Sequence, residues 1–356
     1  MKERIRILYV TDGLGNGGKE RQLIETVKHI NRDIFSPGIV TFSGNQHYTQ
    51  AAEETSDFFR ILPKEKSLAE PVFAVAESFE RFRPHVVHSF DIISAFYTYL
   101  PSLLYGSRIL NASIQDAGLD KGWQRNLKLM LIRHADSVVG NSFKGLKEYG
   151  VEGEVLYNFI EESRFHGHNA GGKFIAAMVA NFSIYKDYDS YFRVVKKLLE
   201  ENLIDEAYAI GSGSRLEEYK GLVGTFDCSV RDKIKFTGSI NNVEEVLSSI
   251  SAGFLFSTEE YGEGISNSVL EYMAAGAIAI ASDIGAVNEI IDNGINGFLV
   301  NKYDIESITE IIKLIRNDRE TYEKIRSNAL DTVRAKFSLK TNIRKLEDLY
   351  IKLAGE

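Results

Sequence analysis

A short β-branched or apolar run, then a polar or glycine-containing turn, then an amphipathic stretch recurs along most of the chain. This alternation constrains the fold more than any other feature, because the hydrophobic period changes from that of a strand to that of a helix within each repeat. Consecutive βα units form a parallel sheet covered by helices. The sequence therefore predicts an α/β protein.

The βα units fall into two runs that a polar stretch at residues 161–173 separates. In the first run, strands are predicted at 5–10, 38–42, 59–62, 86–89, 108–113, 137–140 and 155–157, and helices at 20–30, 72–82, 94–105 and 123–134. In the second run, strands are predicted at 174–179, 206–210, 234–236, 253–256, 277–281 and 298–300, and helices at 188–201, from 215, at 267–275 and along the tail 305–354.

A chain of 356 residues is long enough for two domains, each with its own core. We predict a first doubly wound domain at 1–165, a second at 166–338, and a final helix at 339–356 that packs back toward the first. Two such Rossmann-like domains in tandem are expected to face each other across a cleft and to bind ligands beyond the carboxyl ends of their strands.

Composition narrows the environment and the partners of the chain. The formal net charge is −8, which argues against a nucleic acid partner. One cysteine, Cys228, excludes an internal disulfide and a thiolate metal cluster. No run approaches the roughly 20 apolar residues that span a bilayer. We expect a cytoplasmic protein.

One predicted helix leaves contact with a membrane open. Basic and aromatic residues cluster near this helix: Lys121, Trp123, Arg125, Lys128 and Arg133. They could contact a lipid-linked acceptor or the anionic inner face of the membrane. Alternatively, they form an ordinary solvated helix face.

A glycine-rich turn at residues 12–20 follows the first strand and opens a helix. Its glycines at 13, 15 and 18 resemble a dinucleotide-binding fingerprint, but the next strand ends in Thr41-Phe42-Ser43 and not in the expected acid. A dehydrogenase is therefore disfavoured. The turn either binds a phosphate through the amides near Gly17 and Gly18 or is a structural βα turn.

The segment 259–276 is the most informative part of the sequence. Glu263 follows a predicted strand, and Glu271 comes eight positions later, in the second turn of a helix that begins near Ser266 or Asn267. The amides of residues 265–269 and the helix dipole suit a diphosphate. The two carboxylates suit hydroxyl groups of a sugar and a ribose, unless they are ordinary surface acids.

The same segment resembles the signature of the retaining glycosyltransferases of family 4, which have the GT-B fold: two glutamates separated by seven residues. Glu263, Gly264, Asn267, Glu271 and the following Met-Ala-Ala-Gly fit that signature. Further blocks of the family pattern stand at 157–158, 209–213, 234–238, 282–286, 289–291 and 293–300. The resemblance covers most of the chain and is densest from 174 to 300.

The resemblance implies roles for particular residues. Glu263 would contact the donor sugar, Glu271 the ribose hydroxyls, and Lys186 the diphosphate, where a cation disperses the charge of the leaving group. The donor-binding set is completed by Gly17, Gly18, Gly211, Thr237, Gly238, Gly264, Ile265, Ser266, Asn267 and Ser268.

The chain departs from the family pattern at two places. Asn181 stands where the family often has an arginine, and Gln115 and Asp116 stand where many members carry a histidine that faces the acceptor. Asp116 and His88 are the candidates for a catalytic base. For His88 the alternative is a structural role as a residue near the core.

The resemblance implies an enzyme that moves a sugar, with retention, from a nucleoside diphosphate sugar to an acceptor hydroxyl in polysaccharide synthesis. A UDP-sugar is favoured over a GDP-sugar, and neither a metal nor another cofactor is expected. The acceptor is a glycan, a lipid-linked sugar or a small molecule. Two alternatives remain: a non-catalytic sugar-nucleotide-binding protein on the same fold, and a nucleotide-sugar epimerase.

Overall fold

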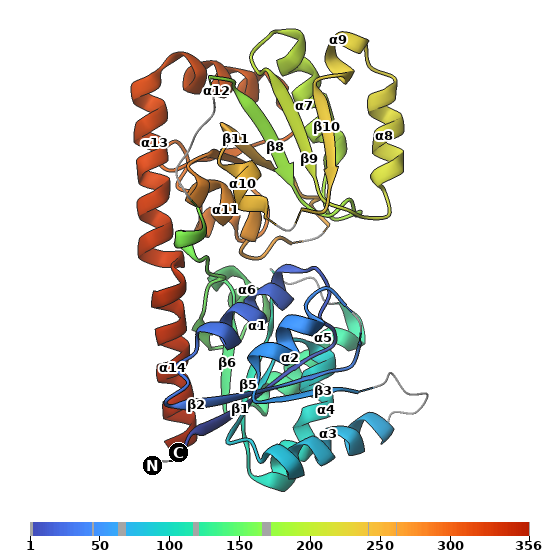
Figure 1. The fold of residues 1–356 in the computed structure, drawn as a ribbon, viewed down its shortest axis with the longest axis vertical. Coiled ribbons are helices and arrows are strands. Elements are labelled where there is room, and N and C mark those ends of the chain that lie inside the picture. The colour runs from blue at the N-terminus through green and yellow to red at the C-terminus, as the bar shows by residue number, and fades with distance from the viewer. Residues whose placement is uncertain are drawn as a thin grey trace. The chain divides into compact units, whose positions relative to one another are not determined.

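The computed structural model describes residues 3–44, 46–62, 69–116, 121–165, 172–240, 242–260 and 262–355. The chain forms two compact units (Figure 1): unit 1 contains Met1–Asn158 and Lys340–Glu356, and unit 2 contains Phe159–Leu339. Each unit holds a parallel sheet with helices, so the predicted α/β class is confirmed. Residues 166–171 of the predicted linker lie outside the described residues, and the predicted domain boundaries stay a prediction.

Unit 1 is a parallel sheet with strand order β3-β2-β1-β4-β5-β6-β7. Its strands are β1 (Ile5–Thr11), β2 (Phe35–Thr41), β3 (Phe58–Ile61), β4 (Val86–Ser89), β5 (Arg108–Ile114), β6 (Ser137–Gly140) and β7 (Glu154–Val155). Its helices are α1 (Gly18–His29), α2 (Thr49–Thr55), α3 (Ala69–Phe82), α4 (Ile92–Tyr105), α5 (Gly122–Arg133), α6 (Phe143–Tyr149) and α14 (Leu339–Gly355). The order reverses between β1 and β4, where doubly wound sheets bind ligands.

Successive side chains of β1 point to opposite faces of the sheet, and both faces are covered by a hydrophobic core. Ile7 and Tyr9 join the cluster that includes α1 and the buried face of α14. Leu8 and Val10 join the cluster that α3 covers through Val75 and Phe79. Because successive strand residues point to opposite faces, one apolar run serves both layers. Helix α14 therefore belongs to the core of unit 1, although it follows unit 2 in the sequence.

Unit 2 is a parallel sheet with strand order β10-β9-β8-β11-β12-β13, which reverses between β8 and β11. Its strands are β8 (Ile175–Val179), β9 (Glu206–Ile210), β10 (Ile234–Gly238), β11 (Ala252–Leu255), β12 (Ile278–Ser282) and β13 (Phe298–Val300). Its helices are α7 (Tyr188–Glu200), α8 (Leu216–Gly224), α9 (Cys228–Arg231), α10 (Val243–Leu247), α11 (Asn267–Ala275), α12 (Ile305–Asn317) and α13 (Arg319–Thr332). Short helices η1 (Glu162–Arg164), η2 (Val287–Glu289) and η3 (Val333–Phe337) complete it.

The elements lie close to their predicted places, and α11 spans the predicted residues 267–275. The short helices α2, α6, α9 and α10 have no separate prediction from the sequence. Helix α2 buries only Ala52, so it lacks an amphipathic period. Helix α6 depends on its ends, where Ser142 caps the first turn and Gly150 adopts the left-handed conformation.

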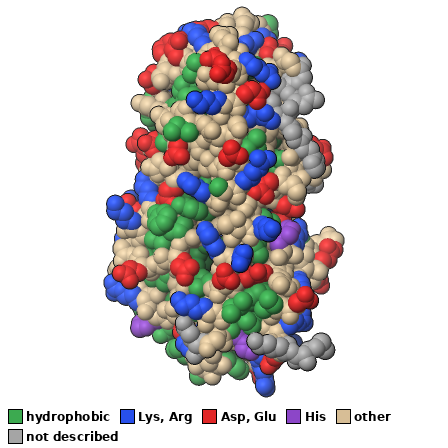
Figure 2. Space-filling model, turned by 90° about the vertical axis from the view of Figure 1, so that its left-hand side faces the viewer, with side chains coloured by type: hydrophobic (Ala, Val, Ile, Leu, Met, Phe, Trp, Pro, Cys, Tyr) green, Lys and Arg blue, Asp and Glu red, His purple; other side chains and the backbone are tan. Residues whose placement is uncertain are grey.

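The surface agrees with the composition of the chain. Acidic and basic side chains are interspersed over the face that Figure 2 presents, as expected for a chain with 42 basic and 50 acidic residues. Within the described ranges, every helix is too short or too polar to cross a membrane.

Helix α11 is fixed to the sheet of unit 2 by Tyr272. The Tyr272 hydroxyl accepts a hydrogen bond from the Val179 amide at 2.6 Å and donates one to the Phe254 carbonyl at 3.1 Å. Its ring lies against Gly253 so closely that a Cβ atom at position 253 would overlap it. The missing side chain of Gly253 therefore determines how near α11 lies to β11.

We expect Gly253→Ala to lower the free energy of unfolding by about 1–3 kcal/mol, because the added methyl group overpacks a buried site. Urea denaturation measures this loss. The matched control is Gly221→Ala in α8, where a Cβ atom meets open space and the better helix propensity of alanine should maintain or raise stability. Equal stability of the two variants would contradict the packing argument.

Candidate functional site

The strand-order reversal of unit 2 brings two loops together. Residues 180–187 follow β8, residues 256–266 follow β11, and these strands are neighbours in the sheet. A β-bridge joins Lys186 to Ser257, and the Asp187 amide donates to the Phe256 carbonyl at 2.9 Å. The backbone thus holds Lys186 beside the carboxyl end of β11, as expected for the ligand-binding edge of this fold.

Lys186 and Glu263 meet at this edge. The Lys186 ammonium forms an ion pair with Glu263 Oε2, and the Ser257 hydroxyl donates to the same oxygen at 2.6 Å. Less than a fifth of either charged side chain is exposed, 19% for Lys186 and 16% for Glu263. The structure thus brings together the two residues that the sequence predicts for the diphosphate and the donor sugar.

The loop after β12 holds Glu263 in place. The Ala286 amide donates to the Glu263 carbonyl at 2.7 Å. Gly285 has φ of 68°, and a Cβ atom there would overlap the Glu263 backbone. Both the left-handed conformation and the close approach require glycine at this position. The block 282–286, which the sequence offers only as part of a family pattern, thus positions the Glu263 loop.

Helix α11 begins at the same edge because it follows β11. The helix dipole makes that end partially positive, and its N-cap residue Ser266 supplies no side-chain cap. The Ser268 hydroxyl ties the first turn to the Val179 carbonyl at 2.7 Å. Glu271 lies in the second turn and is buried, 3% exposed. An anion and hydroxyl groups both suit this arrangement.

Lys302, which the sequence does not single out, links the two loops. It is buried, and its ammonium donates to the Ser257 carbonyl at 2.7 Å and pairs with Asp187 Oδ2 at 2.8 Å. Burial alone would raise the pKa of Asp187, but hydrogen bonds from Lys302 and Ser190 outweigh it and hold that pKa below its ordinary value. A lone lysine after a strand carries no sequence signal for such contacts.

Three further predicted donor residues lie at the same edge of the sheet: Gly211 directly after β9, and Thr237 and Gly238 at the end of β10. The Gly211 amide donates to the Gly238 carbonyl at 2.9 Å, and the exposed Thr237 hydroxyl donates to that carbonyl at 3.1 Å. The Phe182 amide joins these loops to the loop after β8 by donating to the Ser212 carbonyl at 2.9 Å. A cavity of about 620 Å³ opens farther along the edge, after β12 and β13.

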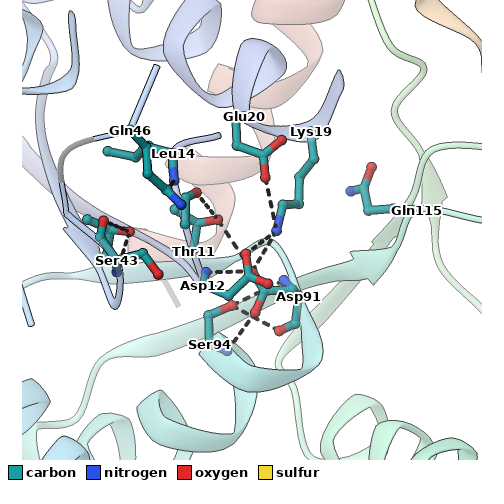
Figure 3. Close-up of polar contacts among 12 residues, drawn as sticks. Thr11, Asp12, Leu14, Lys19, Glu20, Ser43, Gln46, Asp91, Ser94 and Gln115 are labelled. Carbon is teal, nitrogen blue, oxygen red and sulfur yellow. Dashed lines mark hydrogen bonds and ion pairs between the residues drawn. The ribbon is translucent and has the colours of Figure 1, made fainter. Parts of the chain in front are cut away.

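Unit 1 has a charged cluster at its own strand-order reversal, between β1 and β4 (Figure 3). The Lys19 ammonium lies 2.6 Å from Asp12 Oδ1, 3.0 Å from Asp91 Oδ2 and 3.6 Å from Glu20 Oε1. Asp91 also accepts from the amides of Asp12 at 2.9 Å and of Ser94 at 2.8 Å, which caps α4. Lys19 comes from the predicted glycine-rich turn, but the sequence did not indicate its partners.

The charges of this cluster shift the pKa values of its members. Burial lowers the pKa of Lys19, but its three carboxylate neighbours outweigh burial and raise it. Burial raises the pKa of Asp91, yet Lys19 and two backbone amides hold it below its ordinary value. Burial leaves Glu20 with a raised pKa. Because carboxylates outnumber the ammonium, the cluster suits hydroxyl groups better than phosphate, and a phosphate role for Gly17 and Gly18 stays a prediction.

The two candidate bases lie in different surroundings. His88 is buried, stacks on Phe90, and has Nδ1 2.6 Å from the Tyr350 hydroxyl. Burial lowers the pKa of His88 to about 3. Asp116 is partly exposed, accepts from the Tyr149 hydroxyl at 3.3 Å, and lies 3.7 Å from the Lys128 ammonium. The geometry of His88 is that of a core residue.

We expect Asp91→Asn to lower the free energy of unfolding at pH 7 by about 1.5–3 kcal/mol, because asparagine keeps the helix cap and removes the charge paired with Lys19. The folded pKa of Asp91 is lowered, so its contribution is present above the unfolded pKa and is lost as pH falls through the folded pKa. Denaturation at pH 7 and pH 3 should show a smaller difference at pH 3, because only below the ordinary Asp pKa does protonation begin to remove the contribution.

Glu20→Gln is the contrasting variant. The folded pKa of Glu20 is raised, so its contribution is present below the unfolded pKa and is lost as pH rises through the folded pKa. This variant should lose no stability at pH 7. An equal loss in both variants would mean that general packing, and not the charge of Asp91, is being measured.

Comparisons with known proteins concern the family and the fold of the chain. Residues 159–332 match the family model described as "Glycosyl transferases group 1". The chain is 24% identical over 180 residues to the UDP-Gal:alpha-D-GlcNAc-diphosphoundecaprenol alpha-1,3-galactosyltransferase of Escherichia coli, covering 50% of this chain and 45% of that protein. It is 22% identical over 331 residues to the N-acetyl-alpha-D-glucosaminyl L-malate synthase of Bacillus anthracis, covering 86% and 84%.

The match is partial for several relatives. An uncharacterized glycosyltransferase of Methanocaldococcus jannaschii is 28% identical over 170 residues, which cover 47% of this chain and 41% of the relative. The chain thus spans less than half the length of this relative and of the Escherichia coli protein.

Among solved structures, Anabaena HepE in complex with UDP and glucose superposes with a TM-score of 0.84 at 16% identity, over 97% of this chain and 99% of that chain. Sucrose-phosphate synthase from Thermosynechococcus elongatus gives 0.81 at 15% identity, over 98% and 99%. These matches show that the chain has the GT-B fold. Together with the match of residues 159–332, they support a group 1 glycosyltransferase.

Proposed function

We propose that the protein is a retaining glycosyltransferase that moves a sugar from a nucleoside diphosphate sugar, with a UDP-sugar favoured, to an acceptor hydroxyl in the synthesis of a cell-envelope or exopolysaccharide glycan. The observation that carries this proposal is the contact between Lys186 and Glu263 where the strand order of unit 2 reverses, at the start of α11. A cation, a carboxylate and a helix start together match a diphosphate linked to a sugar.

In this proposal different groups of unit 2 bind different parts of the donor. Lys186 and the first turn of α11 bind the diphosphate, Glu263 accepts hydrogen bonds from sugar hydroxyls, and Glu271 accepts them from the ribose. HepE, which has the same fold, was solved with UDP-glucose, and the Escherichia coli relative is named for UDP-Gal. These two names support a uridine nucleotide as the donor.

The proposed reaction breaks the bond between the anomeric carbon and a diphosphate oxygen and forms a bond to the acceptor oxygen on the same face. The leaving diphosphate gains negative charge, which Lys186 and the α11 amides stabilise more than they stabilise the bound donor. The acceptor proton passes to the leaving group, so the step requires no protein nucleophile. We expect turnover without an added metal.

The acceptor is proposed to bind unit 1. Asp116 is favoured over His88 as the group that orients the acceptor hydroxyl, because Asp116 is partly exposed and His88 is enclosed by Phe90 and Tyr350. Relatives named for lipopolysaccharide core synthesis and for a diphosphoundecaprenol acceptor support a lipid-linked or glycan acceptor over a small molecule.

Lys186→Met should lower kcat by about 10²–10³-fold, because one stabilising donor to the leaving group is lost while the length of the side chain is kept. Release of nucleoside diphosphate from the donor measures turnover. The control is Lys235→Met, which removes a lysine of β10 paired with Glu206 and should leave turnover unchanged. Wild-type protein that binds the donor without turnover would favour the binding-protein alternative, and product without acceptor would favour the epimerase.

Glu271→Gln should weaken UDP binding about tenfold or more, because a charged hydrogen-bond acceptor for the ribose becomes neutral. A thermal-shift screen of UDP- and GDP-sugars on wild-type protein first identifies the donor, since a ligand that binds the folded state raises the melting temperature. Titration of the best nucleotide into the variant then measures the loss. Unchanged nucleotide affinity with abolished turnover would refute the ribose assignment.

A further inference from the structure

The basic residues predicted near α5 do not form one surface. Lys121, Trp123 and Arg133 are exposed, whereas Lys128 is buried, with 4% of its surface exposed. Both interpretations of this cluster, contact with a membrane and a solvated helix face, require exposed side chains. Lys128 therefore fits neither of them, and membrane contact by the other residues stays a prediction.

A buried ammonium group needs partners that replace the water it loses. The Lys128 ammonium donates to the Tyr149 hydroxyl at 3.0 Å and lies 4.4 Å from the centre of the Tyr149 ring. It also lies 3.7 Å from Asp116 Oδ2, and the Tyr149 hydroxyl donates to Asp116 Oδ1 at 3.3 Å. The three side chains, from α5, α6 and the loop after β5, thus form one polar cluster.

The chemistry of the three groups fixes the direction of these hydrogen bonds. An ammonium group can only donate, so the Tyr149 oxygen accepts from Lys128 and its own proton is directed to Asp116. An ionised carboxylate can only accept. A chain of hydrogen bonds therefore runs from Lys128 through Tyr149 to Asp116 and orients that carboxylate.

The backbone around Asp116 is held as well. The Gln115 carbonyl accepts from the side-chain amide of Asn141 at 3.0 Å. A Cβ atom on Gly145 of α6 would lie 2.6 Å from the Asp116 carbonyl oxygen, so the missing side chain lets α6 approach this loop closely. Contacts from α5, α6 and the loop after β6 thus restrict both the backbone and the side chain of Asp116.

Asp116 lies where a ligand can reach it. It follows β5, at the carboxyl edge of the sheet, where doubly wound proteins bind ligands. Gln115, the preceding residue, lies at the same edge as Lys19 and its carboxylate partners (Figure 3). The side chain of Asp116 is 24% exposed, against 5% for Lys128. The cluster therefore exposes its carboxylate and buries its cation.

A purely structural role does not require these charges. Replacement of a buried ion pair by well-packed apolar residues is often neutral or stabilising, because the charges must otherwise be removed from water. Leu131 and Ile132 are buried apolar residues of the same helix, so an apolar residue at position 128 would extend the buried face of α5. The buried cation is better explained by its effect on the exposed end of the cluster.

We propose that Lys128 and Tyr149 are positioning residues for the acceptor: they hold the Asp116 carboxylate in one orientation, in which it accepts a hydrogen bond from a hydroxyl group of the acceptor. This inference rests on the proposed function and on the role proposed there for Asp116. A carboxylate that is already oriented lowers the entropy that acceptor binding costs. Lys128 thus acts on the acceptor through Asp116 and not on the donor.

Steady-state kinetics test the proposal, with the nucleotide sugar that the thermal-shift screen selects as donor and p-nitrophenyl glycosides as acceptors. Lys128→Met should lower kcat/KM for the glycoside about tenfold and Tyr149→Phe about threefold, because a misoriented carboxylate weakens the alignment of the acceptor. The KM for the donor should not change. The control Lys147→Met, at an exposed position of α6, should behave as wild type does.

A double-mutant cycle separates positioning from general packing. In the Asp116→Ala background, Lys128→Met should cause no further loss, because a residue that acts through Asp116 then has no carboxylate to orient. Equal losses in both backgrounds, or a raised KM for the donor, would overturn the proposal. Should Lys128→Met not fold, Tyr149→Phe, which keeps the aromatic ring, completes the same cycle.

Failure of this inference and failure of the proposed function give different results. If wild-type protein releases no nucleoside diphosphate with any glycoside, the proposed function fails and the inference fails with it. If wild-type protein transfers the sugar, and both Lys128→Met and Tyr149→Phe transfer it equally well, only the positioning role is refuted.

Discussion

The ion pair between Lys186 and Glu263 depends on the strand order of unit 2, on the buried Lys302 and on Gly285. The strand order places the loops after β8 and β11 side by side, and the Lys302 ammonium joins them through Asp187 and the Ser257 carbonyl. Gly285 lets the Glu263 backbone approach the loop after β12. Each contact restricts a loop that would otherwise cost entropy to order when a ligand binds. The unit therefore presents a largely preorganised cation and carboxylate.

Unit 1 uses the same topology with a different balance of charge. Its reversal also holds a lysine by a helix start, but Lys19, in the first turn of α1, has three carboxylate neighbours, whereas Lys186 forms an ion pair with Glu263 close to the start of α11. A partially positive helix end with a cation suits an anionic ligand, and an excess of carboxylates suits hydroxyl groups. The fold alone would not separate these preferences, because they arise from the side chains at the strand ends.

The sequence predicts those parts of the structure that depend on local pattern. Helix α11 spans its predicted residues because its helical period and its glycine end, Gly276, both lie within the segment. Contacts between distant residues carry no such signal: Lys302 lies 45 positions from the Ser257 carbonyl and Lys19 72 positions from Asp91. The sequence also gives no signal for the surroundings of His88, because its partner Tyr350 comes from α14, 262 residues later.

Helix α4 shows why apolar pattern alone does not tell which face of a helix is buried. Its large residues have the spacing of a core-facing stripe, so the period predicts the helix. The small residues nevertheless face the sheet, and the hydroxyls of Thr98 and Ser102 are satisfied within the helix. Folding leaves Leu100, Leu103 and Leu104 51%, 59% and 71% exposed, so these side chains contribute less hydrophobic free energy to folding than their size would allow.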